Sequence, residues 1–300
     1  MEVCPAFVDE TGVLTAMLKE QPLYGVGLLV VPDPRLVTDS FYRAHFNFVA
    51  DRTTRRNAIR QAILAEDRKL TIPELDRLMW ATRHHEYKFS EVTQSNLQQY
   101  IDLMNIYFSF PQMEFHGLLV DRLDPEFSLD YWRREPWSAY LWLGQQLLKR
   151  RLSRKVFAVV DLQGKPKSAD QYVEDALCAL PNVVGCLRAT SDMSIYLQIV
   201  DILLGCIQFD WKDHHKYYGA TSRRADAKRE LTAFIKAKMN MKRHEPILTD
   251  TVNFRKRTNP STFTAWRWRA YRSKRRKSTA MSGAHPAGGT ASSDHSVLSV

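Results

Sequence analysis

Three aspartates stand where short apolar segments of the sequence end. Asp9 follows the apolar run that begins at Cys4, Asp121 follows GLLV, and Asp161 follows VFAVV. Aspartate is common in turns and at helix starts, so one such residue is ordinary. In an α/β protein, however, strand ends form the edge at which sites are usually assembled. Carboxylate oxygens at such an edge suit a hard cation, Mg²⁺ or Mn²⁺.

A fourth acid, Asp201, lies in the segment Ser194–Phe209, which is apolar at most positions. The polar or small positions of this segment have spacings of 4, 3, 4 and 3, which place them on one side of a helix: Ser194, Gln198, Asp201, Gly205 and Gln208. Because the other faces must be buried, we expect Asp201 to emerge beside the core, where an isolated carboxylate is costly unless it is paired or binds a metal. The alternative is a lone acid on the solvent side of the helix.

Glu86 and Lys88 complete the candidate set. They occur in HEYKFS, which alternates polar and aromatic residues like a short strand or an extended loop. Side chains of an extended segment alternate in direction, so Glu86 and Lys88 point to the same side. The alternative is an ordinary ion pair at the protein surface.

The elements that must position these residues alternate between strand and helix. We expect strands at Cys4–Val8, Leu23–Val31, Met113–Val120, Lys155–Val160 and Asn182–Arg188, the first two as a hairpin. We expect helices at Leu36–Phe48, Thr54–Ala65, Leu75–Arg83, Leu97–Phe108, Leu129–Arg150, Ala169–Ala179, Ser194–Phe209 and Ala225–Met241. This order predicts an α/β protein with a largely parallel sheet covered by helices.

Positive charge is concentrated at the end of the chain. The net charge is +10, and Asn253–Ser278 holds ten lysines and arginines with no acid, so the preceding residues are almost neutral. Cations attract phosphates and aromatic rings stack on exposed bases, which predicts nucleic-acid contact through Arg267, Arg269, Arg272, Lys274, Arg275, Arg276, Lys277, Trp266 and Trp268. The alternative is a solvated basic tail with incidental affinity for polyanions. The Gly/Ser/Ala-rich residues from about Ala280 are expected to be disordered.

The remaining composition bounds the class of protein. Hydrophobic residues make up 44% of the 300, which excludes wholesale disorder. The chain begins without a secretory signal and has no apolar run near the ~20 residues needed to span a bilayer. The four cysteines form no CxxC pair, which favours free thiols of a reducing compartment. We therefore expect a cytoplasmic protein without a membrane partner; its protein partners are not indicated.

Four of these features, in this order, resemble the "domain of unknown function 3800" family. They are Asp9-Glu10-Thr11-Gly12, Glu86-Tyr87-Lys88-Phe89-Ser90, a strand ending in Asp, and Leu197-Gln198-Ile199-Val200-Asp201 followed by Gly205. The chain departs from the family pattern at Thr11, usually serine, and at Val200, usually alanine. The resemblance implies a ribonuclease-H-like mixed sheet flanked by helices over residues 1–210, with a helical insertion at about 33–83. A helical extension over 211–252 and a basic, largely disordered tail over 253–300 would follow.

The resemblance also implies a Mg²⁺- or Mn²⁺-dependent nuclease that acts on DNA or RNA. Asp9, Glu86 and Asp201 would be site acids, with Asp161 and Asp121 competing for a fourth place. Such a site holds two ions about 4 Å apart across the scissile phosphate. Lys88 would neutralise a phosphate oxygen or steady Glu86, while Gln198 and Glu10 would support the ligands. The alternative is a non-catalytic nucleic-acid-binding or regulatory protein that retains the fold.

Overall fold

The computed structural model describes residues 3–12, 22–65, 71–74, 86–110, 112–122, 136–151, 154–219, 222–248, 253–257 and 262–268. The chain divides into two compact units, Met1–Arg269 and Ala270–Val300. All of the described residues belong to the first unit. The predicted helix Leu75–Arg83 and the predicted contacts Arg269, Arg272 and Lys274–Lys277 lie outside the described residues.

The first unit is built on a seven-stranded sheet in the order β5-β4-β1-β2-β3-β7-β6. The strands are β1 (Val3–Thr11), β2 (Leu23–Val30), β3 (Glu114–Asp121), β4 (Lys155–Asp161), β5 (Val183–Ala189), β6 (Asn253–Arg257) and β7 (Thr262–Trp268). The predicted hairpin is confirmed, since β1 and β2 pair antiparallel. Strand β3 returns antiparallel to β2, whereas β4 and β5 continue parallel on the other side of β1. The sheet is therefore mixed rather than largely parallel.

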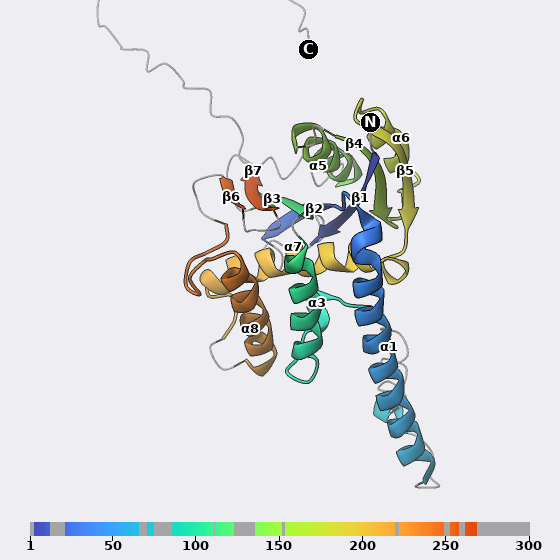
Figure 1. The fold of residues 1–300 in the computed structure, drawn as a ribbon, viewed down its shortest axis with the longest axis vertical. Coiled ribbons are helices and arrows are strands. Elements are labelled where there is room, and N and C mark those ends of the chain that lie inside the picture. Colours follow the sequence, from blue (N-terminus) through green and yellow to red (C-terminus); the bar gives the residue numbers. More distant parts are fainter. Residues whose placement is uncertain are drawn as a thin grey trace, which may run out of the picture. The chain divides into compact units, whose positions relative to one another are not determined.

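Helices cover both faces of this sheet (Figure 1). Helices α5 (Pro136–Arg151) and α6 (Val173–Cys178) pack on one face, over inward side chains such as Ala6, Val8 and Val160. Helix α7 (Ile195–His214) crosses the other face, over Phe7, Leu29 and Phe115. Helices α1 (Pro34–Ala65), α3 (Leu97–Ser109) and α8 (Arg223–Lys238) extend from α7 on the side away from the strands (Figure 1). This third layer explains why α7 is apolar at most positions.

Several predicted boundaries differ from the structure. The helix expected at Ala169–Ala179 is only the short α6, Val173–Cys178. The helices expected at Leu36–Phe48 and Thr54–Ala65 are one continuous helix, α1, because the polar residues between them are all compatible with helix. The domain boundary expected at residue 210 falls inside α7, which continues to His214. The segment expected as a strand or extended loop is extended at Lys88 and then forms a short 3-10 helix, η1 (Phe89–Glu91).

The expectation of a disordered tail from residue 253 is wrong for β6 and β7. Strand β7 pairs parallel with β3 over its whole length, and β6 pairs antiparallel with β7. Phe263 and Ala265 are buried in the core beneath α7. The high density of basic residues around it hid the apolar character of β7, in which Phe263, Thr264 and Ala265 are all buried. The first part of the basic region therefore belongs to the sheet.

Candidate functional site

The ends of β1 and β4 bring three acids to one edge of the sheet. The two strands are parallel, and Val8 pairs with Val160, so Asp9 and Asp161 follow at the same level. Alternation along β1 directs Asp9 to the α7 face with Phe7, and Glu10 to the α5 face with Val8. Asp9 is buried and Asp161 is half-buried. Asp161, rather than Asp121, is therefore the strand-end acid beside Asp9.

Helix α7 adds Asp201 to this edge. Its Oδ2 accepts a hydrogen bond of 2.7 Å from the backbone N–H of Phe89, so Asp201 faces η1 rather than open solvent. Asp201 and Asp161 lie close enough to Asp9 for their negative charges to raise its pKa. Acids from two strands and one helix, far apart in the sequence, therefore act on one another electrostatically.

The segment around Glu86 is held against α7 by buried hydrogen bonds. Glu86 is buried, and its Oε1 lies 2.6 Å from Lys88 Nζ while its Oε2 accepts a 2.6 Å hydrogen bond from Ser191 Oγ. Gln198 joins the same two segments: its Oε1 accepts from the Tyr87 N–H and its Nε2 donates to the Ser191 carbonyl, each at 2.9 Å. The Glu86–Lys88 ion pair is thus held in place by hydrogen bonds from other elements and is not an ordinary ion pair of the protein surface.

The sequence reasoning missed Ser191 and Tyr100. Ser191 contacts Glu86 from the 3-10 helix η2 (Ser191–Met193), which joins β5 to α7. The Tyr100 hydroxyl, from α3, accepts from the Lys88 N–H at 3.2 Å and donates to the Lys88 carbonyl at 2.9 Å. No spacing in the sequence indicates either contact, because both depend on how separate elements pack.

Burial and mutual repulsion raise the pKa values of the clustered acids. Burial, followed by the charges of Glu10, Asp201 and Asp161, holds the pKa of Asp9 well above its usual range. Burial and the nearby Asp161 raise the pKa of Glu10 to about 7. Burial also raises the pKa of Asp161, and it raises that of Asp201 to about 6, although the Phe89 N–H and Lys88 favour the Asp201 carboxylate. Burial is the largest cause for each of these acids, the charges of neighbouring carboxylates add to it, and Lys88 offsets part of the effect at Asp161 and Asp201.

The residues of this cluster fit a hard divalent cation by their chemistry. They are carboxylates whose negative charges raise one another's pKa values. A cation between them would relieve this repulsion. Among the described residues, no three acidic, histidine or cysteine side chains are arranged as a ligand set. Ligation would thus require the carboxylates to change rotamer around the ion.

Asp121 and Arg267 lie apart from this cluster. Strand β2 separates β3 from β1, and Asp121 Oδ2 forms an ion pair of 3.1 Å with Arg267 Nη1. Only 11% of either side chain is exposed. Arg267, expected to contact nucleic acid, is therefore engaged within the protein. Trp266 and Trp268 belong to β7, but their side chains lie outside what the structure describes.

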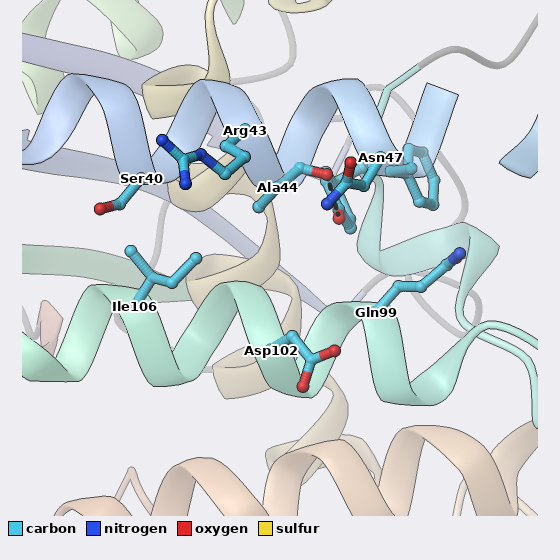
Figure 2. Close-up of a pocket in the computed structure, with 9 residues that line it drawn as sticks. Ser40, Arg43, Ala44, Asn47, Gln99, Asp102 and Ile106 are labelled. Carbon is cyan, nitrogen blue, oxygen red and sulfur yellow. Dashed lines mark hydrogen bonds between the residues drawn. The ribbon is translucent and has the colours of Figure 1, made fainter. Parts of the chain in front are cut away.

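A cavity of about 430 Å³ lies between α1 and α3, behind the Glu86 segment (Figure 2). Its polar lining comes from Ser40, Arg43 and Asn47 of α1 and from Gln99 and Asp102 of α3. Its inner wall includes Tyr87, whose ring stacks on Phe48 at 3.9 Å between centroids. None of the candidate site acids lines this cavity, so it is separate from the acidic cluster.

Comparison with protein-family models, curated proteins and solved structures gave no significant match. No described helix is both long and apolar enough to cross a membrane. Any functional assignment must therefore rest on the site itself.

Proposed function

We propose that the protein is a divalent-metal-dependent nuclease of the ribonuclease-H-like type, which hydrolyses phosphodiester bonds of nucleic acid. This proposal rests on one observation: Asp9, Asp161 and Asp201 lie close to the Glu86–Lys88 pair at one edge of the sheet. The fold supports it: three antiparallel strands are continued beyond β1 by two parallel strands, with helices on both faces, as in ribonuclease-H-like proteins.

Each residue has a role in this proposal. Asp9, Asp161, Asp201 and Glu86 would hold Mg²⁺ or Mn²⁺, and bound ions supply an acidified water and stabilise the leaving oxygen. Lys88 keeps 40% of its side chain exposed while it contacts Glu86, so its ammonium can meet a phosphate oxygen. Gln198 holds the backbone beside Glu86 by accepting from the Tyr87 N–H, and it also donates to the Ser191 carbonyl. Ser191 in turn donates its hydroxyl to the Glu86 carboxylate. Glu10 supports the cluster from the opposite face of β1.

A specific observation favours a second function. The described carboxylates do not form a ligand set of three. A nucleic-acid-binding protein without catalytic activity needs no such set. Such a protein would bind nucleic acid without cutting it, and its binding would not depend on Mg²⁺.

The test is Mg²⁺-dependent cleavage of DNA, RNA and hybrid oligonucleotides by wild type, Asp9→Asn and Asp121→Asn. We expect Asp9→Asn to lower the cleavage rate about 100-fold, because loss of a group that only supports a metal ligand already costs about 10- to 100-fold. Asp121→Asn should retain most of the activity, because Asp121 is paired with Arg267 instead. Thermal unfolding of all three proteins shows whether each is folded. Equal losses in two folded variants, or binding without metal-dependent cleavage, would contradict the proposal.

A further inference from the structure

Two exposed aromatic rings stand on the outer side of α1. Phe46 is 71% exposed and Tyr42 is 43% exposed. They are four residues apart, so they lie one turn from each other on the same side of the helix. The opposite side of α1 is occupied: Phe41 and Phe48 are buried in the core. Exposed rings adjacent on a helix surface indicate a contact made with another molecule.

Arginines continue this side of the helix toward its C-terminal end. Arg56 and Arg60 follow Phe46 at spacings of ten and four residues, which keeps Tyr42, Phe46, Arg56 and Arg60 within about 80° of arc. Residues 52–65 contain four arginines and no acid. We call these four residues, Tyr42, Phe46, Arg56 and Arg60, the outer stripe of α1. It combines apolar rings with positive charge over about 27 Å of helix.

The outer stripe lies on the helix that flanks the candidate site. Phe48 of α1 stacks on Tyr87, the residue between Glu86 and Lys88, and Arg52 lies over the Phe48 ring at 4.4 Å. From this contact α1 extends beyond the ends of α3 and α8 (Figure 1). The outer stripe therefore lies on the helix that supports the Glu86 segment, on the side turned away from the buried Phe48.

We propose that the outer stripe of α1 binds single-stranded nucleic acid. Unpaired bases stack on Tyr42 and Phe46, while Arg56 and Arg60 neutralise backbone phosphates, the combination by which proteins hold single strands. A duplex hides its bases and offers the rings nothing to stack on. This inference rests on the proposed nuclease function and adds to it the class of substrate. It also provides positive charge for the phosphates, which the acidic cluster alone would repel.

The test measures binding of labelled single-stranded and duplex oligonucleotides to the full chain in EDTA, over a salt series. Removal of both rings (Tyr42→Ala with Phe46→Ala) should weaken single-strand binding about 10-fold or more and leave duplex binding unchanged. Arg56→Gln with Arg60→Gln should reduce the slope of log affinity against log salt by about 1.4 on single strands. The matched control is Lys216→Gln with Tyr217→Ala, which removes one exposed cation and one exposed ring beyond the end of α7, away from α1.

Several results would overturn the inference. They are unchanged single-strand affinity in both stripe variants, or equal losses for single strands and duplexes. Binding to vesicles of anionic lipid, or self-association, that the stripe variants abolish without any change in oligonucleotide affinity would also do so. Because EDTA suppresses cleavage, binding is read independently of the nuclease proposal. Stripe-dependent binding by a protein that never cleaves would refute the nuclease function alone.

Discussion

At the scale of single residues, strand ends and helical spacing predict which edge or face Asp9, Asp161 and Asp201 occupy. They do not choose between Asp161 and Asp121, and Glu86 was a candidate only through its place in an extended segment and the family resemblance. The partner of Asp121 cannot be predicted in this way. Arg267 reaches it through the pairing of β7 with β3, two strands 140 residues apart in the sequence.

The raised pKa values predict how stability depends on pH. An acid whose pKa is higher in the folded than in the unfolded protein binds more protons when folded, so stability is lost as pH rises through the folded value. For Glu10 the pKa rises from 4.5 to about 7, and for Asp201 from 3.8 to about 6. The free energy of unfolding in EDTA should therefore fall between about pH 4 and about pH 7, at roughly 1.4 kcal/mol for each unit of pKa difference.

Urea denaturation of wild type and Glu10→Gln across this pH range tests the prediction. Glu10→Gln should make the pH dependence shallower, because the variant lacks the carboxyl group of Glu10 but keeps those of Asp9, Asp161 and Asp201. Asp102→Asn, on the exposed surface of α3, is the control and should leave the wild-type profile unchanged. Mg²⁺ should restore wild-type stability near pH 7 if the cluster binds it. Identical profiles for wild type and Glu10→Gln would show that the surroundings of Glu10 do not raise its pKa.

At the scale of elements, α7 determines the geometry of the site. Its stripe of polar and small residues was predicted from the spacing. The contacts of this stripe show that it binds the segment around Glu86. Gln198 and Asp201 accept hydrogen bonds from the backbone of residues 87 and 89, so one helix face fixes the Glu86 segment. The alternative of a lone acid on a solvent-facing side is thereby excluded for Asp201. The sequence could not show which segment covers the stripe.

Gly205 tests this role of α7. A Cβ at Gly205 would lie 2.4 Å from Phe89 Cβ, an atom fixed to the backbone that cannot move aside by rotation. Gly205→Ala should therefore displace η1, lower the free energy of unfolding by about 1–3 kcal/mol and reduce cleavage. Gly144→Ala, in α5, is the matched control: its Cβ would meet its nearest atom at 3.6 Å, so better helix propensity should stabilise by up to about 1 kcal/mol. Equal stability of the two variants would contradict the close packing of α7 on η1.

At the scale of the whole molecule, the first five strands were predictable and the last two were not. The first five are apolar or alternating segments bounded by turn residues, so local pattern determines them. Strand β6 is mostly basic and β7 lies within the basic region, while the pairing of β7 with β3, and of β6 with β7, cannot be seen in the sequence pattern. The basic region therefore has two parts: strands that complete the sheet, and the unit Ala270–Val300.

Two truncations separate these parts. A chain ending at Arg269 keeps all seven strands and should unfold at the same temperature as the full chain. A chain ending at residue 252 loses β6 and β7, uncovers the edge of β3 and removes the buried Phe263 and Ala265. Loss of Phe263 alone would cost about 3–5 kcal/mol, so this chain should unfold at a lower temperature and aggregate through the free strand edge. Equal thermal stability of the two truncated chains would mean that β6 and β7 do not contribute to the fold.

The same pair of chains isolates the contribution of the cationic unit to nucleic-acid binding. Residues 270–300 carry five lysines and arginines and one acid. Each cation that engages a phosphate adds about 0.7–0.9 to the slope of log affinity against log salt, so the chain ending at Arg269 should show a slope smaller by up to about 4. Its fold and its outer stripe of α1 are retained, so it should still prefer single strands over duplexes. Because counterion release carries no information about base pairing, the cationic unit adds affinity, and the body alone sets the preference. Equal salt slopes for the full chain and the chain ending at Arg269 would show that the cationic unit does not engage the substrate.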